Sequence, residues 1–277
     1  MREHRRDELI WVLLGIIGIS VGTFGTLIGV AGGFLLIPVL FYLYPDESPA
    51  TITSITLAVA FFNALSGSIA YGRLRRIDYR SAVLFSLVGV PGAIIGAAIT
   101  ALLNRGAFQI VFGITLLAVC AYLFLRPERR HQSNDVVPGQ VVRTICDGNN
   151  HTFTYCYSRP LGMGIAFTVG LISGLLGIGG GIIHVPALTQ LLNFPTHIAT
   201  AVSQFVVATT TFAAVDVHIL TGAFAHGIRR AAVLSAGAII GAQLGARLSQ
   251  RTSGVLIMRL LAGGMGIVAI RLIIAPF

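Results

Sequence analysis

The chain has 277 residues, of which 55% are hydrophobic and only 10% are charged. A soluble domain carries charge at roughly a quarter of its positions, so this composition excludes an ordinary soluble protein. All 19 basic residues are arginine, and the formal net charge is +9. The arginines fall in short clusters between apolar runs rather than in a stripe with interleaved aromatic residues, which argues against nucleic-acid binding.

Eight apolar runs follow one another along the chain, each long enough to cross a hydrocarbon core of about 30 Å at about 1.5 Å per residue. They cover residues 9–44, 51–71, 81–103, 106–125, 161–192, 198–222, 231–248 and 254–274. The sequence therefore predicts an all-α integral membrane protein with about eight transmembrane helices in two four-helix repeats. The repeats are expected in residues 1–125 and 161–277, joined by a linker at 126–160.

The first and fifth runs are too long for one straight crossing, because 36 residues of helix would span about 54 Å. Both contain a glycine cluster followed by a proline, namely GTLIGVAGGFLLIP and GLISGLLGIGGGIIHVP. Helices lose their hydrogen-bond ladder at such residues, so both spans are predicted to be broken, as kinked crossings or as re-entrant hairpins. Close packing of small residues is the alternative, which we favour for GAIIGA (92–97) and GAQLGA (241–246).

The two glycine clusters align at an offset of 148 residues, and ATITS (50–54) aligns with ATAVS (199–203) at an offset of 149. An even number of spans in each half predicts parallel repeats, although full hairpins at the glycines would change that count. The N-terminal tail, the loop GRLRRIDYR, the linker and the pair Arg229 and Arg230 would then share one side. The positive-inside rule makes that side the cytoplasm, so we expect a multi-pass protein of the cytoplasmic membrane with both termini cytoplasmic.

The linker begins with the charged segment RPERRHQSND and continues as VVRTIC, DGNN and HTFTYCY. Threonine and aromatic residues suit strands and DGNN suits a turn, so a cytoplasmic β-hairpin is predicted. Cys146, His151 and Cys156 would lie across this hairpin without a fourth ligand, and we predict no metal site there.

The broken spans are the first candidate for binding, because helix ends inside a membrane expose N–H groups that attract anions. Small hydroxyl and amide side chains on the following spans could donate further hydrogen bonds, although serine and threonine also bond back to their own helix. The predicted substrate-binding residues are Gly29, Gly32, Gly33, Thr53, Ser54, Asn63, Gly177, Gly179, Gly180, Gly181, Ser203 and Gln204.

Ionisable residues within the apolar runs occur only in the second half, at His184, Asp216, His218 and Arg259 among the positions we compared. Such groups are usually functional, and histidine titrates near neutral pH, so His184, Asp216 and His218 are candidates for ion or proton coupling. The alternative for Asp216 is an ion pair with Arg229 or Arg230 near the membrane surface.

Together these features resemble the sulfite exporter TauE/SafE-like family of membrane permeases. The resemblance rests on a duplicated segment of the form G-x-x-x-G-x-x-G-x-G-G-G-x-x-x-x-P followed by A-x-x-T-S, and covers nearly the whole chain except the linker. The first half has Ala31 where the second has Gly179, and the second has Val202 before Ser203 where the first has Thr53. The resemblance implies transport of sulfite, an organosulfonate or a related sulfur anion, driven by an ion gradient.

The predicted function is therefore a secondary transporter for a small anion, with the lipid bilayer as surroundings and no cofactor; a homo-oligomer is left open. The chain contains no Gly-x-Ser-x-Gly, Walker A or His-Glu-x-x-His signature, so we predict no catalytic residues and no enzyme activity. A non-transporting membrane scaffold or assembly protein, and an anion channel, remain the alternatives.

Overall fold

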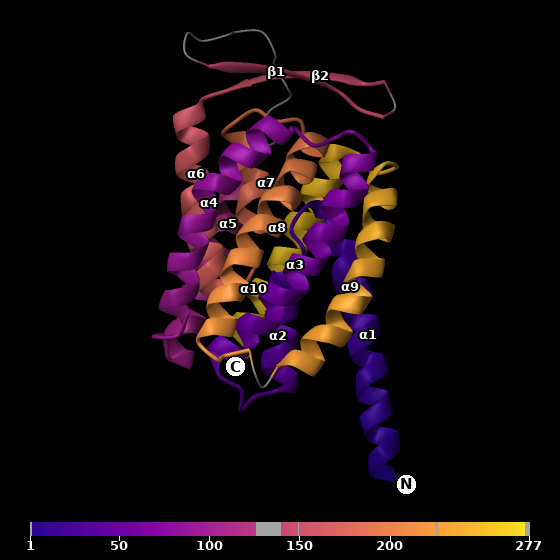
Figure 1. Ribbon diagram of the computed structural model, residues 1–277, viewed down its shortest axis with the longest axis vertical. Coiled ribbons are helices and arrows are strands. Elements are labelled where there is room, and N and C mark those ends of the chain that lie inside the picture. Colours follow the sequence, from indigo (N-terminus) through magenta and orange to yellow (C-terminus); the bar gives the residue numbers. More distant parts are fainter. Residues whose placement is uncertain (1, 126–139, 149, 225–226, 275–277) are drawn as a thin grey trace.

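The computed structural model describes residues 2–125, 140–148, 150–224 and 227–274. The described elements are α1 (Arg2–Ile28), α2 (Gly33–Leu43), α3 (Pro49–Arg73), α4 (Tyr79–Thr100), α5 (Arg105–Leu125), β1 (Val141–Cys146), β2 (Thr152–Tyr157), α6 (Arg159–Leu176), α7 (Gly181–Gln190), α8 (Thr196–Leu220), α9 (Ile228–Ser249) and α10 (Gly254–Ile274). The helices stand side by side as a bundle, and the two strands lie across one end of it (Figure 1). We call this the hairpin end.

Seven of the described helices are long and apolar enough to cross a membrane, namely α1 from Ile10 onward, α3, α4, α5, α6, α8 and α9. The eighth predicted run, 254–274, corresponds to α10, which is not among these seven. The chain is thus a multi-pass helical membrane protein, and the eighth crossing stays a prediction.

The chain turns back on itself between α1 and α2. Gly32, the residue before α2, has a φ of 74°, which favours glycine. A Cβ on Gly32 would lie 2.7 Å from the carbonyl oxygen of Val21, and one on Gly25 would lie 2.8 Å from the carbonyl carbon of Ala31. Residues eleven positions apart are therefore neighbours, so α2 runs back toward the end at which α1 begins.

The same reversal occurs between α6 and α7. Gly180 has a φ of 72°, and a Cβ on it would lie 3.1 Å from side-chain atoms of both Ser173 and Val169 on α6. The α7 helix consequently runs back toward the hairpin end, where α6 begins (Figure 1).

These reversals correct the expected distribution of arginines. Arg76, in the α3–α4 connection, pairs with Asp147 of the hairpin, whereas Arg230, at the start of α9, pairs with Glu47 at the opposite end of the bundle. The beginning of α1 also lies at that opposite end (Figure 1). The prediction that the tail, the α3–α4 loop, the linker and Arg230 share one side is therefore wrong, because each turn adds a reversal.

The predicted parallel arrangement of the halves is wrong for the same reason. It requires α3 and α8 to run in the same direction. Phe61 of α3 contacts Phe212 of α8, with ring centroids 5.4 Å apart, while a Cβ on Gly67 would lie 3.2 Å from the side chain of Gln204. The residue numbers rise along one helix and fall along the other, so the two helices are antiparallel.

Close packing explains the motifs GAIIGA and GAQLGA, as we predicted. A Cβ on Gly92 or Gly96 of α4 would overlap the backbone of α6 at Phe167 or Leu171. Likewise, a Cβ on Gly241 of α9 would overlap the backbone of α1 at Ile19. Only glycine lets the two backbones approach this closely, so these helix pairs form the two tight seams of the bundle.

The strands β1 and β2 pair antiparallel, with Val141 opposite Tyr157 and Cys146 opposite Thr152. The turn is fixed to the bundle, because the N–H of Gly148 donates to the carbonyl oxygen of Leu74 at 2.9 Å. The charged lead of the predicted linker, 126–139, lies outside the described residues.

Candidate functional site

The two glycine turns, residues 29–32 and 177–180, meet inside the bundle. A Cβ on Gly33 would lie 2.9 Å from the carbonyl oxygen of Gly177, and one on Gly181 would lie 2.5 Å from that of Gly29. All the glycines predicted to bind substrate are buried here. The structure thus brings the two predicted glycine sets together at one place.

Polar side chains of α8 hold the first turn. The hydroxyl of Ser203 donates to the carbonyl oxygen of Gly29 at 2.8 Å, and Nε2 of Gln204 lies 3.5 Å from the carbonyl oxygen of Gly25. Ser203 thus bonds a carbonyl of the turn, whereas the Gly25 carbonyl oxygen also accepts the N–H of Val30 at 2.8 Å. Part of the predicted binding set therefore has a structural task.

A second polar contact joins the first turn to α3. The hydroxyl of Thr26 donates to Oδ1 of Asn63 at 2.6 Å, and the hydroxyl of Tyr71 donates to the carbonyl oxygen of Thr26 at 2.8 Å. Thr26 and Tyr71 were not among the residues predicted from the sequence to lie at the site. Thr26 could have been found, because it is a polar residue inside the glycine-rich part of an apolar run.

Several buried polar atoms near the turns lack partners. Within the described residues, Nδ2 of Asn63, Oε1 of Gln204 and Oγ1 of Thr53 have no hydrogen bond, although all three side chains are fully buried. Leaving such a group unpaired costs about 1–3 kcal/mol. Thr53 and Asn63 are ten residues apart on α3, about 15 Å along the helix, so these atoms lie beside the turns at separate points.

The second turn has a different lining. A Cβ on Gly177 would lie 2.6 Å from the methyl group of Thr53 and 2.8 Å from the hydroxyl oxygen of Thr56. The hydroxyls of Ser54 and Thr56 donate to carbonyl oxygens of their own helix, at Thr51 and Thr53. Ser54, a predicted binding residue, thus has its hydrogen bond within α3.

Two helices begin inside the bundle at these turns. Both α2 and α7 start directly after a glycine, Gly32 or Gly180, which has no side chain to accept from the first N–H groups of the helix. The positive ends of two helix dipoles are therefore buried near the free amide N–H of Asn63. Such ends attract anions.

The three predicted coupling residues are dispersed. His184, on α7, is buried, neither ring nitrogen has a partner among the described residues, and its ring meets that of Phe85 edge-on at 6.0 Å. His218 is buried near the end of α8, and its Nε2 likewise lacks a described partner. Asp216 instead lines a groove of about 600 Å³ between α3, α4 and α8.

The alternative expected for Asp216 was an ion pair with Arg229 or Arg230. Arg230 lies 2.6 Å from Oε1 of Glu47, and its guanidinium covers the ring of Tyr44. Among the described ion pairs, neither Arg229 nor Arg230 bonds to Asp216. The pairing that we weighed for Asp216 is therefore not formed.

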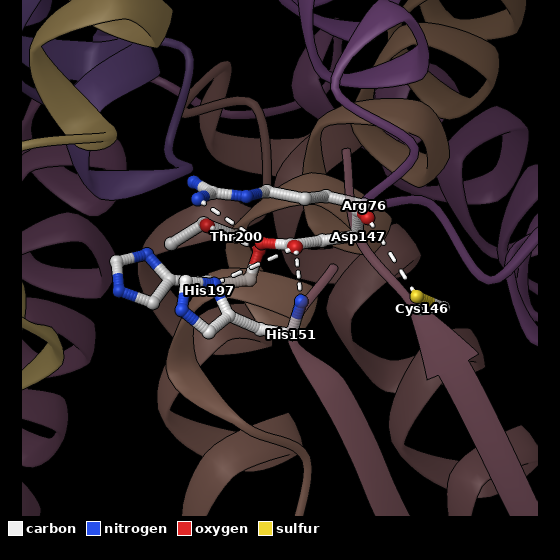
Figure 2. A network of polar contacts seen from close by, with 6 residues as sticks. All are labelled: Arg76, Cys146, Asp147, His151, His197 and Thr200. Carbon is white, nitrogen blue, oxygen red and sulfur yellow. Dashed lines mark hydrogen bonds and ion pairs between the residues drawn. The ribbon is translucent and has the colours of Figure 1, made fainter. Parts of the chain in front are cut away.

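A buried charged network closes the hairpin end (Figure 2). Nη2 of Arg76 lies 3.5 Å from Oδ2 of Asp147, and Oδ1 of Asp147 accepts the N–H of His151 at 2.9 Å. Arg76 is only 5% exposed, and its Nη1 has no partner among the described residues. Figure 2 shows the guanidinium extending toward Thr200 and His197, at the start of α8.

Asp78 fixes the second strand against the bundle. It accepts the hydroxyl of Tyr155 at 2.8 Å and lies 3.6 Å from Nε of Arg143. Burial, reinforced by the neighbouring Asp78 carboxylate, raises the pKa of the Tyr155 phenol. The phenol therefore remains a donor at every physiological pH, and the hairpin stays attached.

A bundle of apolar helices that buries interrupted helices and unpaired amides has the features of a membrane transporter. The comparison with known families agrees: the chain belongs to the sulfite exporter TauE/SafE family, whose model matches residues 14–272. No solved structure matches the chain.

Curated relatives from bacteria and archaea match most of the chain. The probable membrane transporter protein YunE of Bacillus subtilis is 33% identical over 265 residues, which cover 90% of this chain and 93% of the relative. The probable membrane transporter protein MJ0441 of Methanocaldococcus jannaschii is 22% identical over 258 residues, covering 88% of each chain. The probable membrane transporter protein ORF9 of Sinorhizobium sp is 22% identical over 272 residues.

Proposed function

We propose that this protein is a secondary transporter that moves a small sulfur-containing anion, such as sulfite or an organosulfonate, across the cytoplasmic membrane. The family supports the class of protein, and the matched model is named for sulfite export. The anion binds where α2 and α7 begin, beside Asn63 and Gln204.

The observation that carries this proposal is the burial of two helix starts that follow glycines next to the free amide donor of Asn63. Asn63 has a free amide N–H donor, and the first N–H groups of α2 and α7 follow Gly32 and Gly180. An oxyanion would accept from both kinds of donor, whereas a cation would meet the wrong end of both dipoles. A scaffold protein would have no use for helices interrupted in this way.

Arg76 attracts the anion at the hairpin end of the pathway. Its free Nη1 and its long contact to Asp147 leave the guanidinium partly unsatisfied. In this structure the carboxylate of Asp147 lies beside Arg76, where a substrate anion would bind. The Tyr71 hydroxyl connects this end to the first turn through Thr26.

Residues 1–125 and 161–277 act as two inverted repeats, because each glycine turn adds a reversal to four long helices. The two halves then present their turns to the anion from opposite sides of the membrane. Ion-gradient coupling is assigned to His184, which lies on α7 four residues after the second turn and whose ring has no described hydrogen-bond partner.

The functional test is flux into proteoliposomes that contain the purified protein, with radiolabelled sulfite, thiosulfate and methanesulfonate as substrates and chloride as the comparison. Saturable uptake of at least one sulfur anion above empty liposomes is expected. Uptake indistinguishable from empty liposomes for all three would refute the proposal. A linear current without saturation would instead indicate a channel.

We assign the hairpin end to the cytoplasm, because eight described arginines lie there: Arg73, Arg75, Arg76, Arg80, Arg143, Arg159, Arg247 and Arg251. The beginning of α1 then faces outward, contrary to our expectation from the sequence. Cys146 is exposed on β1 and offers a direct test. In a variant with Cys120→Ser and Cys156→Ser, a membrane-impermeant maleimide should label Cys146 only after the cells are opened.

A further inference from the structure

A pocket of about 500 Å³ opens at the hairpin end, where α4, α6 and the two strands meet. It is lined by Arg80, Leu84, Arg143, Tyr157, Arg159 and Met163. The three arginines come from three different elements, namely α4, β1 and the start of α6. The transport pathway proposed above uses none of these six residues, so the pocket needs a separate explanation.

The charge in this arginine pocket is unbalanced. Arg143 lies 3.6 Å from Asp78, a carboxylate that also accepts hydrogen bonds from Ser81 and Tyr155. Arg80 and Arg159 are exposed, and neither forms an ion pair with a described residue. Among the described residues, Asp78 thus balances only Arg143, and the pocket attracts a ligand with negative charge.

The floor of the pocket is apolar. Leu84 lies five residues into α4 and Met163 four residues into α6, which places them about 6–8 Å along their helices at 1.5 Å per residue. Beyond the floor, α4 exposes Leu87 (69%) and α6 exposes Phe167 (38%) on the outside of the bundle. Charge at the rim is thus followed directly by apolar surface that faces the hydrocarbon of the bilayer.

We infer that the arginine pocket binds the phosphodiester headgroup of an anionic phospholipid, whose acyl chains lie along α4 and α6. A free anion would gain from the three arginines alone, whereas a phospholipid also uses the apolar floor and the exposed side chains below it. Because the arginines belong to α4, α6 and β1, a bound headgroup ties the hairpin to the two helices. The lipid therefore holds the hairpin end together.

The test compares lipids on delipidated protein in detergent, with native mass spectrometry counting bound lipids and thermal unfolding reporting stabilisation. The probes are dioleoyl phosphatidylglycerol, dioleoyl phosphatidylcholine and inorganic phosphate. Arg80→Gln/Arg159→Gln is the main variant, because these two arginines are exposed and form no described ion pair. Arg247→Gln/Arg251→Gln is the matched control, since both arginines are exposed at the same end but do not line the pocket.

Phosphatidylglycerol should bind and raise the unfolding temperature, while phosphatidylcholine and phosphate should not. Each arginine near an anionic lipid contributes about five-fold in affinity, so the Arg80→Gln/Arg159→Gln variant should bind phosphatidylglycerol roughly twenty-fold more weakly, with the control unchanged. Equal binding of both lipids, equal effects of both double variants, or full stabilisation by phosphate alone would each overturn the inference. None of these outcomes depends on transport activity.

Discussion

The two glycine turns share a backbone shape and differ in what surrounds them. Each follows a long helix, contains left-handed glycines and starts a shorter helix that runs back. The first is bonded by Ser203 and by Gln204, and its Thr26 contacts Asn63. The second turn lies against Thr53 and Thr56 of α3, and no amide side chain is among the nearest neighbours of its described glycines.

Because of this difference, the two turns are expected to contribute unequally to substrate binding and to folding, although their sequences are similar. The shared backbone supplies the helix ends, which suit any anion, and requires only glycine at the points of closest approach. The unequal side chains give the first turn amide groups, whereas the second turn lies against threonine side chains. We therefore expect the first turn to decide substrate binding and both turns to decide folding.

The largest effect is expected where the turns touch. A Cβ introduced by Gly181→Ala would overlap Cα of Val30 and lie 2.5 Å from the carbonyl oxygen of Gly29. Backbone atoms cannot move aside cheaply, so we expect a loss of at least about 3 kcal/mol in unfolding free energy, or misfolding. The measurement is thermal unfolding in detergent with size-exclusion chromatography.

Gly164→Ala, on the preceding helix, is the control, because nothing lies within 4 Å of the added Cβ. This change should stabilise the helix by up to about 1 kcal/mol. Equal unfolding temperatures for the two variants would mean that the turns do not touch as described.

The second-largest effect is expected in anion affinity, which should distinguish the first turn from the second. Asn63→Leu beside the first turn replaces the amide with an apolar side chain of similar size and removes its free N–H donor, and should weaken anion affinity about 10–100-fold, as expected for hydrogen bonds to a charged group. Thr53→Val beside the second turn should change it by less than about three-fold. Substrate binding is measured by isothermal titration and flux in proteoliposomes. A larger loss in Thr53→Val would reverse the proposed roles.

A smaller effect, in the opposite direction, is expected at the hairpin end, which Tyr71 connects to the first turn. Asp147→Asn keeps an acceptor for the His151 N–H but removes the charge that competes for Arg76. Initial flux should rise about five-fold, equivalent to about 1 kcal/mol. Glu47→Gln removes the ion pair to Arg230 at the other end and should leave flux unchanged. Unchanged flux in Asp147→Asn would show that this ion pair does not gate entry.

The remaining effect concerns the backbone of the second turn and is small compared with that of Gly181→Ala. Gly179 has a φ of 77°, and the matching position in the first turn is Ala31, which has a φ of 58°. Gly179→Ala should therefore cost only about 1–2 kcal/mol in unfolding free energy, less than Gly181→Ala. Its added Cβ would lie 3.2 Å from that of Ala60, a tight but adjustable contact. A loss as large as that of Gly181→Ala would show that the second turn tolerates no side chain.

Much of the architecture follows from the sequence alone. Apolar runs of about twenty residues determine the helices, because a bilayer demands internally bonded backbone over its whole thickness. Asn63 and Gln204 could be selected from the sequence, since amides in apolar runs are costly and need a reason. The structure places both beside the first turn, while their role in binding stays a prediction.

Tertiary structure alone decided the direction of the chain and the partners of the charges. Glycine and proline permit a kink or a full reversal, and the contact of Gly32 with Val21 settles which occurs; this overturned both the parallel halves and the shared arginine side. Asp147 meets Arg76 across 71 residues of chain, a distance that no local pattern encodes. In helices that are apolar all round, sequence cannot tell which face is buried, so His184 and Asp216 looked alike until packing separated them.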